Sequence, residues 1–530
     1  MYEPSPINAT HVFPRVTPDF VKANYPCKFK LIQVQLFHRH GERSPTTTRF
    51  ANVTPKSWDF CKLANGMRKG YREMLVKAVN NTNRSYSLHT QAVDGNMVMD
   101  NFREMYHDER VFPVYQSVSG SDDAQSPDGL KVQEINLDER TSDKTCGWGQ
   151  LTDVGWNTMH KTGGYLRSLY IDQLGFLPPD AKNLTQNQMY LRTTDYSRTI
   201  ESLYQVLSGL YPIYDKDILG SAGSVYKGRF SINVRPKYVE TLILNYNCKN
   251  LKKNLIDMHQ KALELYTDEK NKAEELIDNS PTIGKEAREI LENTDVPSQF
   301  QSVYDTLIAM RAHNIAIPPE IPLSEVDELG KLAAKQWMFS LVFSPELGRM
   351  QWGPTGLEVV NNMISMIFKD KGLTPADKYG QVIDFSLPLP VVDVPSFSIS
   401  SGHDTTIVPM LGALGFYRQD GTTDPQKFTI EWPVYGSVIA LELFEGPKLE
   451  PKPTIEKRKD WPSTIPSGFN ADGYYVRANF NGSPITIPKC LEPGNHDPEM
   501  GPTMCTLDAF FQQLQPMVLT TKEWKELCRS

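Results

Sequence analysis

The sequence lacks any long hydrophobic run and any excess of basic residues. No stretch approaches the roughly 18 consecutive apolar residues of a membrane-spanning helix, and the mean hydropathy is −0.43. The 56 lysines and arginines stand against 63 aspartates and glutamates, which gives a net charge of −7. A surface of that sign does not as a whole attract nucleic acid or an anionic membrane. If the ligand is an anion, the cations that bind it must be gathered locally.

Cysteine pairs at CxxC spacing are also absent, which argues against a zinc ribbon or a thiol redox centre. The seven cysteines are scattered, and their odd number leaves at least one unpaired. They fit either a few disulfides or ordinary buried thiols. Cys490 and Cys505 flank a loop rich in glycine and proline. A disulfide there would add roughly 3 kcal/mol of stability by restricting the unfolded chain; two free thiols in a reducing compartment are the alternative.

The N-terminus shows neither the basic segment nor the apolar segment of a signal peptide. The protein is therefore either cytosolic, or a signal has been removed and Met1 stands in its place. N-x-S/T sequences, which accept glycans in exported proteins, occur at Asn8, Asn52, Asn80, Asn83, Asn183 and Asn481. We expect a secreted protein, or one in the lumen of a secretory or lysosome-like compartment, with a cytosolic or mitochondrial location left open.

Hydrophobic periodicity alternates between strands and helices over most of the chain. Residues 29–37, 189–191 and 396–400 have strand patterns, and the last two are followed by helical patterns. Between about 249 and 345 the pattern is almost entirely helical. This order predicts an α/β fold with a mixed-sheet core, helices on both faces and an inserted, mostly helical cap domain.

The length of 530 residues suits such a core with insertions better than three domains. An early insertion is expected to begin with a helix over 58–78 and to continue as a polar loop over 110–145. The predicted division is a core of residues 27–60, 146–215 and 346–530, an insertion at 61–145 and a helical cap at 216–345.

The densest chemical signal lies at residues 39–45, which read RHGERSP. The segment follows a strand, and ligands of open α/β sheets bind beyond the carboxyl ends of strands. Guanidinium groups match the oxygens of phosphate. Arg39 and Arg43 flank His40, whose imidazole can attack phosphorus as a nucleophile. A basic surface turn is the alternative interpretation.

Two further segments follow predicted strands. His403 and Asp404 lie between a strand and a helix; alone, Asp404 would be read as a helix cap, but beside the first motif it is a candidate acid for the departing alkoxide. Arg192 lies at the end of another strand, where it can complete a phosphate cage. Arg198, in the helix that follows, is interpreted as a surface residue or part of a structural ion pair.

In this order the motifs resemble the histidine acid phosphatase family, the acid phosphatase and phytase branch of the histidine phosphatase superfamily. They are RHGxRxP at 39–45, GQLTxxG at 149–155, RxTxxxRxxxS at 192–202 and SGHDTT at 401–406. The C-terminal part, with VRANFNG at 476–482, is similar as well, so the resemblance covers about residues 27–530. Within the family the chain looks most like the lysophosphatidic acid phosphatase type.

The resemblance implies an acid phosphatase that hydrolyses phosphomonoesters through a covalent phosphohistidine. His40 would be the nucleophile, and Asp404 would protonate the leaving group and then help to activate water. Because Asp404 must be protonated for this role, we expect an acidic optimum, where a protonated His403 would add positive charge. The residues that would hold the phosphoryl oxygens are Arg39, Arg43, Arg192 and His403. No metal or cofactor is implied.

Three substrate classes remain open because the segment 44–148 is long for the family: small phosphomonoesters, lysophosphatidic acid and inositol phosphates. The lysines of the helical region are offset by acidic residues, which weighs against inositol polyphosphates. A phosphoester-binding protein without turnover and a metallophosphatase are the competing classes. The expected partner is a small phosphate ester and not nucleic acid, with no integral membrane segment, and the sequence does not indicate an oligomeric state.

Overall fold

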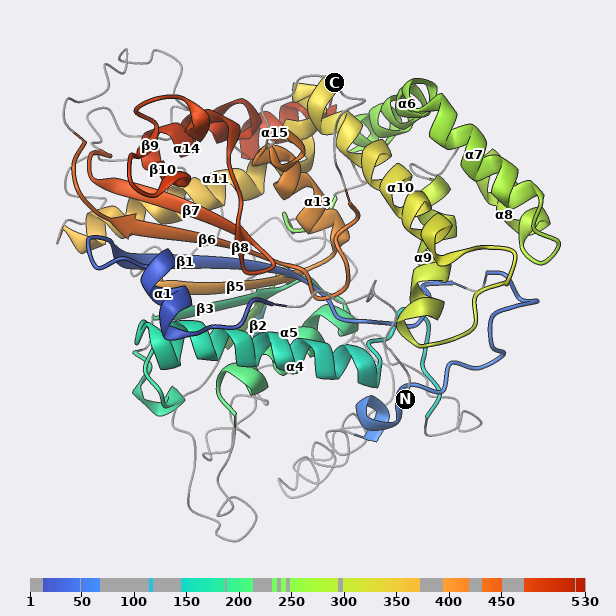
Figure 1. Cartoon of the computed structure of the whole chain (residues 1–530), viewed down its shortest axis with the longest axis horizontal. Helices are drawn as coiled ribbons and strands as arrows, with labels where there is room; N and C mark the ends of the chain where they lie inside the picture. The colour runs from blue at the N-terminus through green and yellow to red at the C-terminus, as the bar shows by residue number, and fades with distance from the viewer. Residues whose placement is uncertain are drawn as a thin grey trace, which may run out of the picture.

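The computed structural model describes residues 13–47, 49–66, 114–117, 144–185, 188–212, 231–235, 240–244, 248–293, 299–371, 394–418, 431–449, 471–519 and 521–529. A mixed sheet crosses the middle of the molecule (Figure 1). The strands from β2 to β1 are parallel, and those from β1 to β9 are antiparallel. Their order is β2 (Val114–Ser117), β4 (Ser231–Val234), β3 (Met189–Thr193), β5 (Phe397–Gly402), β1 (Lys30–Arg39), β6 (Val438–Glu445), β7 (Tyr474–Phe480), β10 (Gly501–Thr506) and β9 (His496–Asp497), with β8 (Ser483–Pro484) beside β7.

Strand β1 lies near the middle of the sheet and is covered on both faces. Val34 and Leu36 pack into the apolar cluster formed with helices α4 (Asp153–Arg167) and α5 (Ser197–Leu210). On the opposite face the amide groups of Gln33 and Gln35 donate to backbone carbonyls of α11 (Pro345–Asp370) at 3.1 and 3.2 Å. Buried amides need such partners, so the helix and the strand fix each other in register.

A block of helices stands at one end of the sheet (Figure 1). With α11, the mixed sheet and the helices on its two faces, this block confirms the predicted fold class. The helices of the block are α6 (Lys249–Leu265), α7 (Thr267–Asp278), α8 (Gly284–Glu292), α9 (Gln299–Ala312) and α10 (Leu323–Phe343).

Shorter helices complete the fold. α13 (Asp404–Ala413) follows β5, and α14 (Leu507–Leu514) follows β10. The remaining helical segments are α1 (Pro18–Asn24), α15 (Thr521–Arg529), the π-helical turn Ser168–Gln173 and the 3-10 turns Ala181–Asn183, Phe416–Arg418, Pro488–Leu491 and Gln515–Met517.

Two strands come from parts of the chain that the sequence pattern assigned elsewhere. β2 lies in the predicted insertion and β4 in the predicted cap, yet both pair in the sheet. The loop predicted over 110–145 is therefore wrong at β2, because four residues pairing at a sheet edge leave no periodic signal. The helix predicted over 58–78 is described only as far as Gly66, where residues 62–66 are helical; the rest lies outside the described residues.

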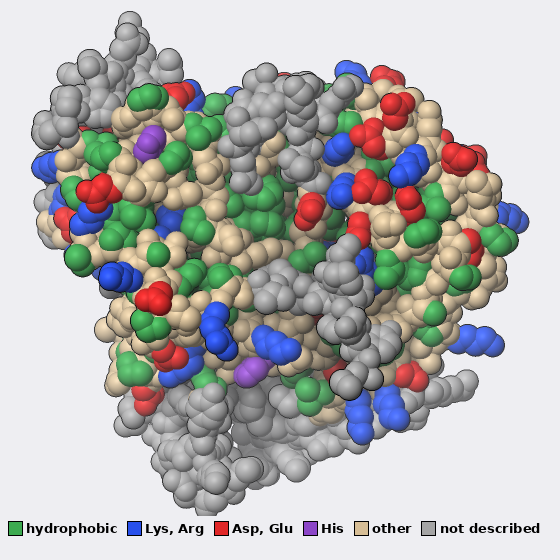
Figure 2. Space-filling view, viewed as in Figure 1, with side chains coloured by type: hydrophobic (Ala, Val, Ile, Leu, Met, Phe, Trp, Pro, Cys, Tyr) green, Lys and Arg blue, Asp and Glu red, His purple; other side chains and the backbone are tan. Residues whose placement is uncertain are grey.

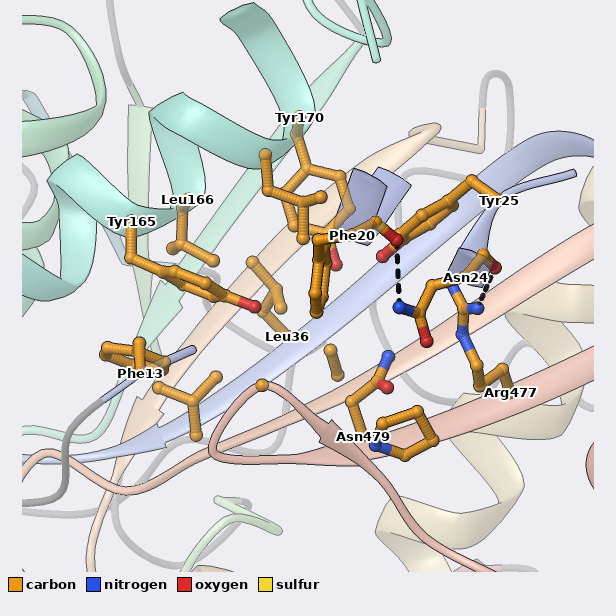
Figure 3. Close-up of a pocket in the computed structure, with 15 residues that line it drawn as sticks. Phe13, Phe20, Asn24, Tyr25, Leu36, Tyr165, Leu166, Tyr170, Arg477 and Asn479 are labelled. Carbon is orange, nitrogen blue, oxygen red and sulfur yellow. Dashed lines mark hydrogen bonds between the residues drawn. The ribbon is translucent and has the colours of Figure 1, made fainter. Parts of the chain in front are cut away.

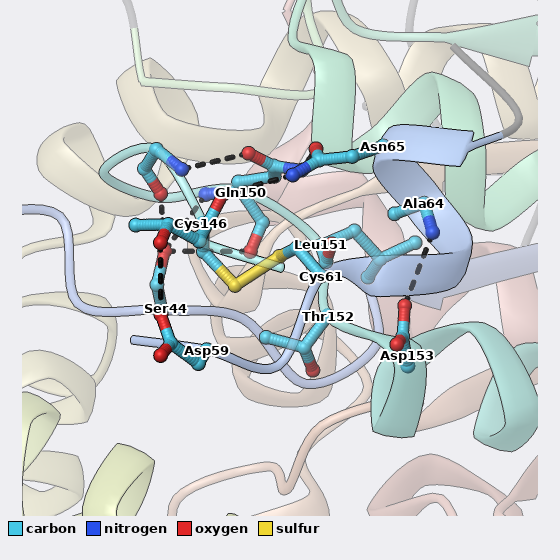
Figure 4. The surroundings of a disulfide bond; sticks show 12 residues. Ser44, Asp59, Cys61, Ala64, Asn65, Cys146, Gln150, Leu151, Thr152 and Asp153 are labelled. Carbon is cyan, nitrogen blue, oxygen red and sulfur yellow. Dashed lines mark hydrogen bonds between the residues drawn. A yellow bond between two sulfur atoms is a disulfide. The ribbon is translucent and has the colours of Figure 1, made fainter. Parts of the chain in front are cut away.

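Three disulfides tie distant segments together, and they include the Cys490–Cys505 pair expected from the sequence. The Cys61–Cys146 disulfide joins the two ends of the predicted insertion (Figure 4). The Cys248–Cys528 disulfide fixes α15 against the start of α6. Cys27 is the free, exposed thiol that the odd number requires.

A buried carboxylate, Glu442 of β6, organises the region between the sheet and the N-terminal segment. Figure 3 shows the cavity beside it, whose lining includes Tyr25, Tyr170, Arg477 and Asn479. Glu442 accepts hydrogen bonds from the hydroxyls of Tyr25 and Tyr170 at 2.7 and 2.8 Å, and from Arg477 and Asn479 at 2.9 and 2.8 Å. The neighbouring cavity has about 10 Å³, room for about one water molecule. This region is a structural network and too small for a substrate.

Glycines set the distance between α4 and α5, and this predicts a sharp contrast between two neighbouring positions. A Cβ at Gly163 would lie 2.0 Å from the carbonyl oxygen of Val206, whereas one at Gly164 would meet nothing within 4 Å. Gly163→Ala should therefore lower the free energy of unfolding by about 2–3 kcal/mol through overpacking. Gly164→Ala, the matched control, should raise it by up to about 1 kcal/mol. Denaturant unfolding of both variants checks this; equal effects would contradict the close contact.

Candidate active site

The carboxyl ends of three adjacent parallel strands meet at one edge of the sheet. β5 lies between β3 and β1, with Gly402 opposite Arg39 and Ser401 opposite Thr193. The register continues just beyond the strands, since the amide of His40 donates to the carbonyl of Gly402 at 3.0 Å. Residues that follow these strands therefore converge, at the position where open α/β sheets bind ligands.

His40 lies at the centre of this edge and is 2% exposed. Its Nδ1 is 2.8 Å from the carbonyl oxygen of Gly41. Because a carbonyl can only accept, Nδ1 carries the proton and Nε2 keeps its lone pair. Burial, with the positive charges of Arg198, Arg39 and Arg43, holds the pKa of His40 well below its usual value. The imidazole is therefore neutral, as a nucleophile must be.

Arg39 and Asp404 form a buried ion pair beside His40. Nη2 of Arg39 is 2.8 Å from Oδ2 of Asp404, and Nη1 donates to the carbonyl of Pro433 at 2.6 Å. The guanidinium also stacks 4.3 Å from the centre of the Tyr435 ring. Asp404 is the first residue of α13, whose N-cap is His403. Asp404 is thus not the N-cap of the helix, and its carboxylate contacts Arg39 of the RHGERSP motif.

His403 is held by hydrogen bonds on both ring nitrogens. Arg198 can only donate, so Nδ1 of His403, 3.3 Å from its Nη2, is the acceptor. Nε2 then carries the proton and donates to Oγ1 of Thr194 at 2.9 Å. Burial, then the charges of Arg198 and Arg43, hold the pKa of His403 well below its usual value. This differs from the expectation of an extra positive charge on His403 at low pH, because the arginines disfavour a further cation.

Arg43 is paired with a carboxylate from the helical block. Its Nη2 and Nη1 lie 2.7 and 3.4 Å from the two carboxylate oxygens of Asp305, in the middle of α9. Both side chains are 5% exposed. Burial opposes ionisation of Asp305, but the charges of Arg43 and Arg39 outweigh it and lower its pKa. The helical block therefore contributes a negative charge directly to the site.

Arg192 has a different environment from the one expected. Its guanidinium is paired with Glu240 and, at 2.6 Å, with Glu358, and it also donates to Oγ1 of Thr241 at 2.9 Å. Glu358 bonds Arg235 as well, at 2.6 Å. The arginine charges hold the pKa of buried Glu358 at about 2 against the effect of burial. Arg192 thus belongs to a balanced ionic cluster, while Arg198, expected to be structural, lies against the catalytic motifs.

Four buried donors around His40 have no partner among the described residues. They are the Nε atoms of Arg39, Arg43 and Arg198 and the hydroxyl of Tyr435. Burying a donor without a partner costs roughly 1–3 kcal/mol, and here several surround one imidazole. The arrangement is that of an anion site, in which ligand oxygens would satisfy the donors.

The comparison with known families agrees with this geometry. A sequence model of the histidine phosphatase superfamily (branch 2) matches residues 30–481. The chain belongs to this superfamily. It is an enzyme of the acid phosphatase and phytase type, and the resemblance drawn from its motifs is confirmed.

Relatives of this histidine phosphatase are similar over long stretches at low identity. A probable acid phosphatase of Schizosaccharomyces pombe is 22% identical over 97% of both chains. The lysophosphatidic acid phosphatase type 6 of Bos taurus is 22% identical over 72% of this chain and 69% of its own. Among solved structures, Hafnia alvei phytase in complex with tartrate has a TM-score of 0.51 at 14% identity, covering 95% of this chain and 99% of the phytase. That likeness concerns the fold.

In this histidine phosphatase the GQLT motif contacts the backbone of the RHGERSP motif. Leu151 pairs with Arg43 in an isolated antiparallel bridge, and the Ser44 amide donates to the carbonyl of Gln150 at 3.0 Å. Thr152 caps α4 and donates to the carbonyl of Glu42 at 3.2 Å. The motif therefore has a structural role: it fixes the backbone of residues 42–44, which carries Arg43.

Metal-binding groups and membrane-spanning helices are both absent from the described residues of this histidine phosphatase. There, no group of three or more His, Cys, Asp or Glu side chains could hold a metal ion, and His38 is buried with Nδ1 3.1 Å from the carbonyl of Arg39. In the same part of the chain, no helix has the length and apolar character needed to cross a bilayer.

The two arginines of the third motif should respond oppositely to removal. Arg198→Ala is expected to lower kcat/KM for p-nitrophenyl phosphate by roughly 100-fold or more, by analogy with loss of an oxyanion donor, at little cost in stability. Arg192→Ala leaves two buried carboxylates undercompensated and should lower the free energy of unfolding by about 3–5 kcal/mol. Initial rates and denaturation curves separate the two. If folded Arg192→Ala lost more activity than Arg198→Ala, their assignments would have to be exchanged.

Proposed function

We propose that this protein hydrolyses phosphomonoesters by transferring the phosphoryl group first to His40 and then to water. The observation that carries the proposal is the state of His40: its Nδ1 is committed to the carbonyl of Gly41, which leaves Nε2 unprotonated among three arginines. In the first step the bond between Nε2 and phosphorus forms and the bond to the ester oxygen breaks. In the second, a water oxygen displaces Nε2 and releases orthophosphate.

Asp404 is the proposed proton carrier of both steps. A protonated Asp404 gives its proton to the departing alkoxide, and the resulting carboxylate takes a proton from the attacking water. Its location supports this role, since Asp404 follows β5 and contacts Arg39 of the adjacent β1, at the sheet edge that carries His40. Because the acid must be protonated for the first step, an acidic optimum follows.

Arg39, Arg43 and Arg198 are the proposed ligands of the phosphoryl oxygens, with His403 beside them. Arg198 takes the place that the sequence pattern assigned to Arg192, because Arg198 keeps a free buried donor next to His40 and His403. Fixed positive charge stabilises the spread negative charge of a loose phosphoryl transition state. The arginines can supply this stabilisation, and we therefore propose catalysis that needs no metal ion.

Small phosphate esters are the substrate class that the charge distribution favours. On the helical block, basic and acidic side chains alternate over the surface (Figure 2), and several are paired, as in Lys335–Glu269 and Lys272–Glu325. A polyphosphorylated ligand would need an uninterrupted basic surface. The mixture supports a compact monoester over an inositol polyphosphate.

An oxidising compartment is proposed from the three disulfides, because structural disulfides persist in exported proteins and are rare in the cytosol. A similarity to the lysosomal acid phosphatase of Bos taurus, 22% identical over 76% of this chain, is in line with a secretory or lysosome-like location.

His40→Ala should abolish turnover while the protein stays folded. The loss of the nucleophile is expected to reduce kcat for p-nitrophenyl phosphate by at least about 1,000-fold. Incubation with ³²P-labelled substrate, followed by a gel run without acid, should label the wild type on histidine and leave the variant unlabelled. His160→Ala, at an exposed position on α4, is the matched control. Substantial residual turnover would refute the nucleophile assignment, and inhibition of the wild type by EDTA would refute metal independence.

Asp404→Asn should discriminate between leaving groups. An alkyl phosphate needs protonation of its leaving oxygen, so kcat is expected to fall by roughly 100-fold or more. An activated aryl phosphate leaves without it and should lose much less. The measurement is the dependence of kcat on leaving-group pKa across a series of esters. A uniform loss over the series would exclude Asp404 as the acid.

A further inference from the structure

The charges buried around His40 can be counted from their contacts. Arg39 is paired with Asp404 at 2.8 Å and Arg43 with Asp305 at 2.7 Å, whereas Arg198 forms no ion pair with a described carboxylate. His40 and the neighbouring His403 are neutral. Among these contacting groups three cations face two carboxylates, a balance of about one positive charge. The buried Glu42 and the neighbouring Arg49 carry one formal charge of each sign and leave that balance unchanged.

Asp305 differs from Asp404 in origin and in use. It comes from α9 in the helical block, 262 positions from Arg43 in the sequence. The proposed reaction gives it no proton to carry, yet both of its oxygens lie on Arg43 and its side chain is 5% exposed. A structural tie between block and core would not need a phosphate-site arginine. The position instead places a fixed negative charge at the edge of the anion site.

We propose that Asp305 is a specificity-determining residue that restricts the site to singly charged phosphate groups. This inference rests on the proposed function and deepens it. The second ionisation of a phosphomonoester has a pKa of about 6, so the monoanion predominates in acid and the dianion above neutrality. A pocket with one net positive charge matches the monoanion. The proton that the monoanion brings is also the one that Asp404 must deliver to the leaving group.

The charged and titratable groups around Asp305 allow its effect to be isolated. Arg43 and Arg39 are the nearest cations, and Arg49 adds a third on the same segment. Arg198 of α5 and the buried Tyr435 also interact electrostatically with it. Burial, outweighing the nearby cations, raises the pKa of Tyr435 to about 12, so this hydroxyl stays neutral. Neutralising Asp305 therefore adds one positive charge without another carboxylate on α9 to replace it.

The test is the affinity of the full-length protein for inorganic phosphate, measured by calorimetry at pH 5 and pH 8. Asp305→Asn keeps the shape of the side chain and one acceptor for Arg43. It should tighten phosphate binding roughly tenfold at pH 5. At pH 8 the gain should be near the square of that factor, because the added charge acts twice as strongly on a dianion. The alkaline limb of kcat/KM should move to higher pH with it.

Matched variants separate charge from packing. Asp327→Asn breaks the Arg311–Asp327 ion pair between α9 and α10, and should leave both affinities unchanged. Asp305→Glu keeps the charge and should behave like the wild type. Equal gains at the two pH values, a weaker affinity in Asp305→Asn, or a gain in Asp305→Glu would overturn the proposal.

The wild type supplies a test that does not depend on any variant folding. Its affinity for phosphate should be no tighter at pH 8 than at pH 5, and strong preference for the dianion would overturn the proposal. Because phosphate binding is measured without turnover, the role of Asp305 and the proposed hydrolytic function can be refuted independently. A protein with this binding pattern but no hydrolysis of p-nitrophenyl phosphate contradicts the proposed function alone. Hydrolysis without the pattern contradicts the role of Asp305 alone.

Discussion

Mutual repulsion among Arg39, Arg43 and Arg198 is the constraint that the rest of the site must satisfy. Two positive charges 4 Å apart repel by about 4 kcal/mol at the effective dielectric of a partly buried site. Each arginine has a different compensation: Asp404 for Arg39, Asp305 for Arg43, and the lone pair of His403 for Arg198. The same field keeps both imidazoles neutral. The cations that would hold a phosphate therefore also prepare the nucleophile that attacks it.

The topology follows from the need to bring these groups together. Only adjacent parallel strands place their carboxyl ends side by side, and β3, β5 and β1 are such neighbours. These strands could be predicted because each has a clear apolar pattern. β2 and β4 could not, because strands of only four residues carry too little periodicity to be distinguished from loops. Sheet pairing, and not local pattern, makes them strands.

The residues of the site likewise fall into those that the sequence could place and those that it could not. His40, Arg39 and Asp404 directly follow predicted strands, so the sequence places them at the correct edge. Arg192 and Arg198 both stand near the end of β3, and sequence spacing cannot say which faces His40. That choice depends on Glu240 and Glu358, which bind Arg192 from 48 and 166 positions away. The Arg43–Asp305 pair could not be predicted either, because the sequence around a helical carboxylate does not indicate which distant residue it contacts.

The origin of Asp305 links the assembly of the protein to the charge of its pocket. The helical block packs on the core through apolar contacts, but its α9 also delivers the carboxylate that Arg43 needs when it is buried. A buried cation without a partner is strongly destabilising, so the burial of Arg43 depends on the carboxylate that α9 supplies. The same contact sets the charge of the pocket. An overall acidic chain can thus hold a small, positively charged site, because only the part of the arginine charge left uncompensated by the two aspartates is offered to the ligand.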